Sequence, residues 1–566
     1  MFQKSAADVM MEMLIEWGVD HIYGMPGDSI NTLIESLRKV KDKIDFIQVR
    51  HEETGALAAA AYAKLTGKLG VCMGIAGPGA IHLLNGLYDA KLDGAPVLAI
   101  AGQVETDLMG TDFFQEVDLP SVFKDVAVYS QTIMSAEQLP AVLNQAIRTA
   151  YDKKGPAVLI IPDDVPKFEV ERNALKTTSF VSKSTVIAHE DDLRAASEIL
   201  NEAKKPVILA GKGARGAKDT LLTFAEILKA PIILTLPGKG VIPDEHPYNL
   251  GQLGLIGTKP ATLAVEEADT LIMIGTSFPF VGFLPDGLKT IQIDKDPTQI
   301  GKRYPVDVGM AGDAGETLTR LLPMLKPASD PQFLQTCQQH LQEWRIKLQE
   351  KAQTEAVPIK PQFVINELQK VTKDDAVLSV DVGNVTVWMA RYFNMTNQQF
   401  IISSWLATLG CGLPGAIAGK IAYPDKQVIA VCGDGGFQMM MNDFVTAVKY
   451  NLPMVVVILN NHKIAMIKFE QEVMGNAEFG TNLHNPDYAK YAEICGGIGY
   501  RVEKPEELPP ALSKAVQETK PCIIDVVVDA DEAPLPAKIT FSQAMGYARH
   551  MMKEFFQEGT IHKPPL

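Results

Sequence analysis

Short runs of apolar, often β-branched residues alternate with longer helical patterns along almost the whole chain. The runs at residues 97–101, 207–210, 428–431 and 454–459 are apolar at every position rather than at every second one. Strands of this kind are covered on both faces, as in parallel sheets flanked by helices. The alternation therefore predicts an α/β protein built from doubly wound parallel sheets.

Two changes in composition divide the chain of 566 residues. Residues 166–188 are polar and rich in Lys, Ser and Thr, whereas residues 325–360 form a charged, Gln-rich, helix-like stretch. At about 150 residues per domain, a chain of this length is expected to hold three to four domains. We predict α/β domains at residues 1–184, 185–340 and 355–530, followed by a C-terminal tail at 531–566.

The first and third of these domains share a spacing. In the first, a strand ends at Gly77, within Gly-Pro-Gly, and a new strand opens 19 residues later at Pro96. In the third, a strand ends at Gly433, within Gly-Asp-Gly, and a new strand opens 20 residues later at Pro453. We interpret the two domains as variations on one plan. A chance similarity between α/β units is the alternative.

Composition and charge exclude several classes of protein. The chain carries 53 Lys and Arg against 68 Asp and Glu, a net charge of −15, which argues against nucleic acid as the main partner. A phosphorylated cofactor is not excluded, because a few backbone N–H groups and one metal ion can hold a diphosphate. The six cysteines form no Cys-x-x-Cys pair, so reduced thiols are expected rather than disulfides.

Signals for secretion or membrane insertion are not evident. The longest apolar runs are about seven residues long, against the roughly 18 residues that a membrane-spanning helix needs. The first apolar stretch is interrupted by Glu12 and Glu16. A cytoplasmic protein is therefore expected.

The strongest chemical signal lies in the third domain. An apolar strand leads into Gly-Asp-Gly-Gly at residues 433–436, and a pair of Asn residues ends at Asn461 after the next strand. Neighbouring parallel strands would place Asp434 and Asn461 side by side at their carboxyl ends, where open α/β sheets bind ligands. A carboxylate and an amide oxygen suit Mg²⁺ that also binds phosphates. A plain turn with an Asn pair in a loop is the alternative.

This arrangement, Gly-Asp-Gly, 24 residues and Asn-Asn, resembles the thiamine-diphosphate-binding motif of the thiamine-dependent enzymes. The resemblance extends over nearly the whole chain and is strongest to the pyruvate oxidases. It implies thiamine diphosphate and Mg²⁺ as cofactors. The implied diphosphate contacts are Gly433, Gly435 and Gly436, and the implied Mg²⁺ ligands are Asp434, Asn461 and the main-chain carbonyl near Lys463.

The family also places a glutamate from the first domain of a partner subunit against the aminopyrimidine of the cofactor. Residues 49–56, Val-Arg-His-Glu-Glu-Thr-Gly-Ala, match that motif at Glu52. Glu52 opens an apolar run, where a poorly solvated carboxyl has a raised pKa and can exchange a proton with a ring nitrogen. The resemblance thus implies an ylid nucleophile and a homo-oligomer, expected to be a tetramer, with active sites built between two subunits. A surface helix start is the alternative.

Other segments resemble the surroundings of the active centre in pyruvate oxidases. Residues 23–29 resemble a loop that closes over it, Phe114 and Gln115 a pair that approaches it, and residues 467–471 a substrate segment with Glu470 as a second acid/base. Met466 stands where these oxidases usually have Phe. The further implied contacts of thiamine diphosphate are Asp28, Ser29, Gly77, Leu409, which bends the cofactor, Met466 and Ile467, a wall of the pocket.

Three turns of the central domain imply a second cofactor. Each follows an apolar strand, and in an oxidase-like chain they resemble an FAD site, with turn backbone at the diphosphate and Asp294 at the adenosine end. A plain α/β turn is the alternative for the first of them. The implied contacts are Gly211, Gly213, Ala214, Arg215, Gly275, Thr276, Ser277 and Asp294.

The C-terminal tail carries apolar residues at a four-three-four-three spacing, which predicts an amphipathic helix that packs on its own protein. A reversible contact with the inner face of the cell membrane is the alternative, and quinone-reducing relatives use their C-terminal segment in this way. The apolar positions are Phe541, Met545, Ala548, Met552 and Phe555.

The resemblance implies flavin-linked oxidative decarboxylation of pyruvate. The ylid adds to the keto carbon, CO₂ leaves, and the enamine passes two electrons to FAD. The acetyl group then leaves as acetyl phosphate, with phosphate and O₂ consumed and H₂O₂ formed, or as acetate with a quinone as acceptor. An acetolactate synthase or a simple 2-keto-acid decarboxylase is the enzymatic alternative, although Phe469-Glu470 does not match the Gln-Trp pair of the synthases. A scaffold protein that retains the fold is the non-enzymatic alternative.

Overall fold

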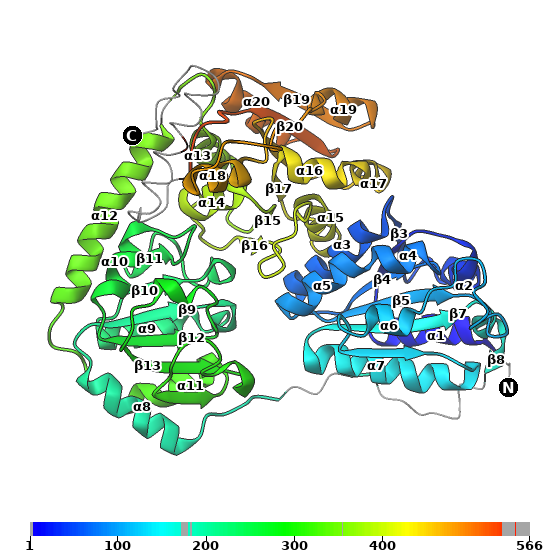
Figure 1. Cartoon of the computed structure of the whole chain (residues 1–566), viewed down its shortest axis with the longest axis horizontal. Helices are drawn as coiled ribbons and strands as arrows, with labels where there is room; N and C mark the ends of the chain where they lie inside the picture. Colours follow the sequence, from blue (N-terminus) through cyan, green and yellow to red (C-terminus); the bar gives the residue numbers. More distant parts are fainter. Residues whose placement is uncertain (1–3, 171–178, 181–183, 354, 535–549, 551–566) are drawn as a thin grey trace.

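Three six-stranded parallel sheets, each covered by helices, form the framework of the protein (Figure 1). The computed structural model describes residues 4–170, 179–180, 184–353, 355–534 and 550. The expected doubly wound α/β fold is confirmed. The predicted tail positions 541, 545, 548, 552 and 555 lie outside the described residues.

The sheet of the first domain has the strand order β3-β2-β4-β5-β7-β6. Two further strands pair antiparallel beside it, which the sequence did not predict. The antiparallel pair is β1 (Lys4–Ser5) and β8 (Glu169–Val170). The strands of the six-stranded sheet are β2 (His21–Gly24), β3 (Asp45–Gln48), β4 (Gly70–Gly74), β5 (Val97–Gln103), β6 (Tyr129–Thr132) and β7 (Pro156–Pro162). The α-helices of the first domain are α1 (Ala6–Glu16), α2 (Asn31–Lys39), α3 (Glu52–Thr66), α4 (Pro78–His82), α5 (Leu84–Asp93), α6 (Leu119–Phe123) and α7 (Leu139–Lys153).

The third domain repeats this topology. Its sheet has the order β16-β15-β17-β18-β20-β19, so both sheets follow the pattern 2-1-3-4-6-5 when their parallel strands are numbered along the chain. The prediction of one shared plan is confirmed. The strands are β15 (Val377–Val380), β16 (Gln399–Ile401), β17 (Val428–Gly433), β18 (Val455–Asn460), β19 (Ile498–Val502) and β20 (Cys522–Val527). The α-helices are α13 (Pro361–Val371), α14 (Asn384–Tyr392), α15 (Gly412–Ala422), α16 (Asp434–Met440), α17 (Phe444–Lys449), α18 (Ala465–Val473), α19 (Tyr488–Ile494) and α20 (Leu508–Ala515).

The central domain has a different order, β11-β10-β9-β12-β13-β14, or 3-2-1-4-5-6. In this order the ligand crevice lies where the connections reverse, between β9 and β12. The strands are β9 (Pro206–Ala210), β10 (Ile232–Leu234), β11 (Asn249–Gln252), β12 (Thr270–Ile274), β13 (Lys289–Asp294) and β14 (Val308–Ala311). The α-helices are α8 (Glu190–Glu202), α9 (Lys218–Leu228), α10 (Lys259–Glu267), α11 (Ala314–Leu321) and the Gln-rich α12 (Gln332–Ala352).

Helices α3 and α15 join the first and third domains (Figure 1). Both are rich in Ala and Gly, and small side chains let two helices approach closely. Their buried faces share one apolar cluster. Tyr423 and Tyr450 of the third domain also donate hydrogen bonds to the carbonyls of Leu65 and Phe46, at 3.0 and 2.8 Å.

The remaining sequence expectations concern cysteines and membranes. All six cysteines are described and free, and five of them are buried. Within the described part of the chain, no helix is both long and apolar enough to cross a membrane.

Candidate functional site

The structure brings Asp434, Asn461 and Lys463 together at the carboxyl ends of the neighbouring strands β17 and β18. Oδ2 of Asp434 accepts the N–H of His462 at 2.7 Å, and Oδ1 of Asn461 accepts the N–H of Lys463 at 3.0 Å. His462 has a φ of +58°, a left-handed conformation that turns the chain back toward Asp434. Three predicted ligand positions therefore lie in one pair of turns.

Asp434 is a buried carboxyl, 2% exposed. Burial raises its pKa, although hydrogen bonds from Asn485, Gly435 and His462 oppose the shift. Among the described residues, no Lys or Arg forms an ion pair with it. A buried carboxylate without a cation is costly, so a bound cation would stabilise this turn. The oxygen donors of this set fit Mg²⁺ rather than a softer metal.

Two further polar residues complete this edge, and the sequence analysis missed both. Asp381 follows β15 and is fully buried; its carboxylate accepts the N–H groups of Val382, Gly410 and Gly412 at 2.8, 2.9 and 3.2 Å. Burial raises the pKa of Asp381 to about 6. Asp381 is followed by Val and Gly and comes directly after an apolar strand, much as Asp434 does within Gly-Asp-Gly. This pattern could have identified Asp381 from the sequence.

Asn485 is the second. Its amide donates to Asp434 at 2.7 Å and to the side-chain oxygen of Asn460 at 2.8 Å. It lies in the loop before α19, 24 residues beyond Asn461. No local motif marks it, because only the fold brings that loop to the strand ends.

The predicted residues of the first domain also gather at one carboxyl edge, after β2, β3, β4 and β5. Oγ of Ser29, beside Asp28, accepts the N–H of Ala76 at 2.8 Å. Gly77 has a φ of +66°, and a Cβ there would lie 2.9 Å from the carbonyl oxygen of Gln115. Gln115 itself has a φ of +65°, and its neighbour Phe114 is 75% exposed.

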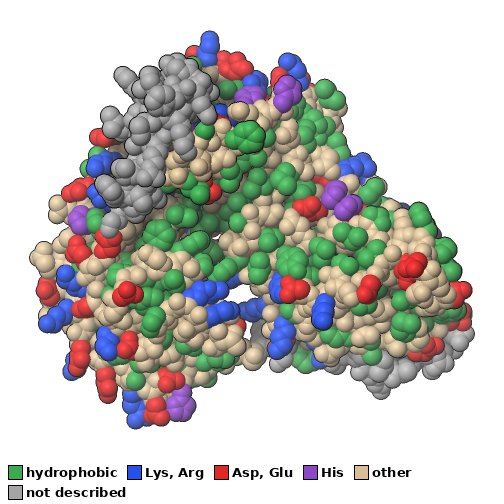
Figure 2. All heavy atoms as spheres, in the orientation of Figure 1, with side chains coloured by type: hydrophobic (Ala, Val, Ile, Leu, Met, Phe, Trp, Pro, Cys, Tyr) green, Lys and Arg blue, Asp and Glu red, His purple; other side chains and the backbone are tan. Residues whose placement is uncertain are grey.

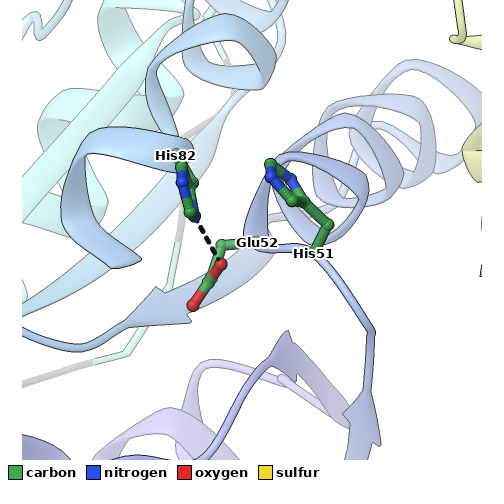
Figure 3. A group of neighbouring side chains, drawn as sticks. All are labelled: His51, Glu52 and His82. Carbon is green, nitrogen blue, oxygen red and sulfur yellow. Dashed lines mark hydrogen bonds and ion pairs between the residues drawn. The ribbon is translucent and has the colours of Figure 1, made fainter. Parts of the chain in front are cut away.

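Glu52 begins α3 at this edge and is enclosed by its own domain (Figure 3). Its Oε2 lies 2.9 Å from Nδ1 of His82, and its side chain is 9% exposed. A Cβ on Gly79 would come within 3.0 Å of Oε1, so glycine keeps the second oxygen open. His82 was not predicted, although it follows the Gly-Pro-Gly turn by only three residues.

The two edges do not merge within one chain. Among the described residues, Glu52 makes no hydrogen bond or ion pair with Asp434, Asn461 or Lys463. The loop at residues 403–410, which carries Leu409, connects them instead. Asn85 donates to both Glu53 and Thr408, at 2.5 and 2.9 Å, and Gly410 is held by Asp381.

The same loop reaches the central domain. Trp405 packs against the guanidinium of Arg303, 5.0 Å from the ring centroid. Arg303 donates to the carbonyl and the hydroxyl of Ser277, at 3.1 and 2.6 Å. One loop therefore contacts all three domains and ends beside a turn predicted to bind flavin.

The glycine turns of the central domain meet at the crevice between β9 and β12. A Cβ on Gly211 would lie 2.6 Å from the carbonyl oxygen of Gly275, and a Cβ on Gly213 would lie 2.6 Å from the Cα of Gly275. Asp294 ends β13, and burial raises its pKa. The predicted Gly211, Gly213, Ala214, Gly275, Thr276 and Ser277 thus occupy the ligand position of a dinucleotide-type sheet.

Lysine and arginine side chains border the opening between the central and first domains (Figure 2). Lys212 donates to the carbonyl of Asp93 at 2.6 Å, and Arg215 donates to those of Pro237 and Phe400, at 3.2 and 3.4 Å. Lys212 thus reaches the first domain and Arg215 the third. Burial lowers the pKa of both side chains, because it disfavours their charged forms. Neither forms an ion pair with a carboxylate among the described residues, so the two cations fit a diphosphate.

The predicted substrate segment forms the first turns of α18. Met466 is half-buried, Ile467 is 44% exposed, and Glu470 is exposed. Lys468 of the same helix forms ion pairs with Asp531 and Glu472. The exposed Ile467 and Glu470 are therefore free to face another surface.

These features define a class, the three-domain α/β proteins that hold diphosphate cofactors at the carboxyl edges of their sheets. Three family models identify the class more closely. They describe the thiamine pyrophosphate enzyme N-terminal TPP binding domain at residues 4–122, its central domain at 193–321 and its C-terminal TPP binding domain at 381–526. The chain belongs to the thiamine pyrophosphate enzyme family, as its Gly-Asp-Gly and Asn-Asn residues suggested.

Similar proteins cover almost the full length of the chain. It is 54% identical to the "Putative thiamine pyrophosphate-containing protein YdaP" of Bacillus subtilis (strain 168), over 100% of this chain and 99% of that protein. It is 38% identical to the pyruvate oxidase of Lactiplantibacillus plantarum, over 94% and 90%. It is 33% identical to the acetolactate synthase isozyme 3 large subunit of Escherichia coli (strain K12), over 94% and 96%.

Proposed function

We propose that this thiamine-dependent enzyme carries out the flavin-linked oxidative decarboxylation of pyruvate. The observation that carries the proposal is the loop at residues 403–410. It joins the edge that holds Asp434 to the glycine turns of the central domain through Trp405 and Arg303. Adjacent sites for thiamine diphosphate and FAD are the arrangement that electron transfer between two cofactors requires.

Each edge contributes its own residues to binding. Asp434, Asn461 and the carbonyl of Lys463 would hold Mg²⁺, with Gly433, Gly435 and Gly436 at the diphosphate and Leu409 against the ring system. When bound, thiamine diphosphate supplies the carbon nucleophile that decarboxylation of a 2-keto acid needs. Glu52 would hold or release a proton at a ring nitrogen. Glu470, Phe114 and Gln115 would orient pyruvate, and Met466 and Ile467 would exclude water.

The central domain would bind FAD through the crevice between β9 and β12. Lys212, which the sequence analysis did not single out, and Arg215 would neutralise its diphosphate, and Asp294 would contact the adenosine end. Neither cation forms a close ion pair among the described residues, although Asp93 lies near enough to act on both, and this supports the assignment. A flavin site distinguishes an oxidase from a simple decarboxylase.

The decisive experiment mixes the purified protein, loaded with thiamine diphosphate, Mg²⁺ and FAD, with pyruvate under anaerobic conditions. Loss of the yellow flavin absorbance within one turnover supports oxidation. Parallel assays with O₂ plus phosphate and with a quinone plus lipid vesicles identify the acceptor and separate acetyl phosphate from acetate. Oxidised flavin throughout, with acetolactate or acetaldehyde as product, would refute the proposal.

We also propose that two subunits build each active site, within a homo-oligomer such as a tetramer. Phe114 at the first edge and Phe479 in the third domain are 75% and 86% exposed, and among the described residues Glu52 makes no hydrogen bond or ion pair with Asp434, Asn461 or Lys463. Mixing inactive Glu52→Gln and Asp434→Asn subunits should restore about a quarter of the activity if subunits redistribute at random. No recovery would contradict shared sites.

The tail and the location of the protein are tested together. His550 is buried, and its Nδ1 lies 2.7 Å from the carbonyl oxygen of Asn476, just beyond α18. We propose a cytoplasmic enzyme whose tail packs on the protein. A gain of activity with vesicles, lost when the chain is cut after Pro536, would instead favour the membrane contact and the quinone acceptor.

A further inference from the structure

His51, Glu52 and His82 form a cluster of titratable side chains at the edge of the first sheet (Figure 3). The two imidazole rings stack, with centroids 4.3 Å apart and 28° between their planes. The side chain of Glu52 is 9% exposed, whereas that of His82 is 41% exposed. The contact between them therefore links an enclosed carboxyl to solvent through one imidazole.

Two histidines and a glutamate also suggest a cation site, but the stacking argues against it. An imidazole offers its lone pair in the plane of its ring. Because the two rings lie face to face, their lone pairs do not converge on one point. Nδ1 of His51 also accepts the N–H of Glu53 at 3.3 Å, as the N-cap of α3. Acid–base chemistry suits the cluster better than metal binding.

The hydrogen bonds assign the protons of the two rings. Since Nδ1 of His51 accepts a hydrogen bond, a neutral His51 carries its proton on Nε2. Nδ1 of His82 faces a carboxylate oxygen at 2.9 Å, so it carries the proton there and donates. Nε2 of His82 is then the nitrogen that can take up another proton.

We propose that His82 carries protons between solvent and Glu52, and so acts as a positioning residue for that carboxyl. A proton from water adds to Nε2 of His82 while Nδ1 gives its proton to Oε2 of Glu52. Glu52 ends neutral, and His82 ends neutral with its proton on Nε2. The reverse transfer returns one proton to water. Oε1, beside Gly79, stays free for the cofactor.

This inference rests on the proposed role of Glu52 and extends it by naming the group that reloads the carboxyl. It accounts for two observations at once. The side chain of Glu52 is only 9% exposed, and His82, at 41%, is its more exposed hydrogen-bond partner. Because His82 acts through Glu52, its loss should slow proton exchange without abolishing cofactor binding.

The test measures exchange of the C2 proton of thiamine diphosphate with D₂O, by quenched-flow NMR on the full chain with Mg²⁺ and without keto acid. His82→Gln can still donate a hydrogen bond to Glu52 but cannot carry a proton. We expect exchange about a hundredfold slower than in the wild type, with unchanged cofactor affinity and partial recovery in added imidazole. His82→Asn should slow exchange to a similar extent. Agreement between the two variants would show that the effect does not come from misfolding of one of them.

His189→Gln is the matched control. His189 caps α8 in the central domain through the same Nδ1 to N–H contact, at 3.3 Å, that His51 makes on α3. In the His189→Gln variant, the C2 proton of thiamine diphosphate should exchange at the wild-type rate. Wild-type exchange in both His82 variants, or a loss that imidazole does not reduce, would overturn the inference. Normal exchange without pyruvate oxidation would contradict the proposed function and leave the role of His82 standing.

Discussion

The first and third domains order their strands alike, yet the buried carboxyls at their carboxyl edges have different partners. In the first, the carboxyl of Glu52 is hydrogen-bonded to His82, 2.9 Å away. In the third, Asp434 is buried, and no Lys or Arg of the described residues pairs with it. The shared scaffold thus determines where side chains gather. On our proposals, the partners of the carboxyl in each turn then determine whether an edge exchanges protons or binds a cation.

Corresponding turns show the same contrast. After the first strand of each sheet pattern, Asp28 is exposed in the first domain, whereas Asp381 is fully buried in the third. At the N-cap of the helix that follows the third strand, Gly77 has a φ of +66° and Gly433 a φ of −74°. Residues in corresponding turns therefore differ in burial and backbone conformation, and substitutions in both turns can test each difference.

The largest expected effect comes from Asp434→Asn. Loss of the charge should weaken Mg²⁺-dependent binding of thiamine diphosphate about a thousandfold, as measured by titration calorimetry. Without cofactor, the thermal midpoint should rise by a few degrees, because an unpaired buried charge is removed. Wild-type affinity in this variant would show that the third edge does not bind a cation.

Glu52→Gln should have the next largest effect. It keeps the size of the side chain but cannot exchange a proton, so turnover of pyruvate should fall about a hundredfold or more. Cofactor affinity should change by only a few fold. If cofactor affinity falls as far as in Asp434→Asn, the proposal that the first edge exchanges protons and the third edge binds a cation is wrong.

Asp381 predicts a dependence of stability on pH. Its pKa is raised from 3.8 to about 6 in the fold, so the native state binds more protons than the unfolded state between these values. The free energy of unfolding should therefore fall, by up to about 3 kcal/mol, as the pH rises from about 4 to about 6, and level off above. Urea unfolding of the cofactor-free protein measures this slope.

The control for that slope is the corresponding exposed residue. Asp381→Asn should flatten the slope, although it also leaves a backbone N–H without its acceptor and lowers stability overall. Asp28→Asn should leave the slope as it is, because Asp28 is exposed. A slope that survives in Asp381→Asn would assign the pH dependence to another buried group.

Much of the fold and part of the candidate site could be predicted from the sequence. Apolar strands followed by Gly-Asp-Gly or Gly-Pro-Gly predict both the sheets and the edges, because the carboxyl ends of parallel strands meet. Asn485 and Trp405 could not be predicted, since long-range packing alone brings their loops to these edges. The pairing of His82 with Glu52 depends on the close approach of α4 to α3, which no spacing in the sequence encodes.

The smallest effect, and the finest test of the comparison, is a Cβ at the two equivalent glycines. Gly77→Ala should cost about 1–2 kcal/mol, because its φ of +66° is unfavourable for an L-residue. A Cβ there would also displace Gln115. Gly433→Ala should leave stability within about 1 kcal/mol of the wild type, since its backbone is extended and nothing lies within 4 Å of the added carbon. That open space is where we expect the diphosphate, so Gly433→Ala should still weaken cofactor binding, measured beside thermal unfolding. Equal losses of stability at both positions would mean that the two turns are conformationally alike after all.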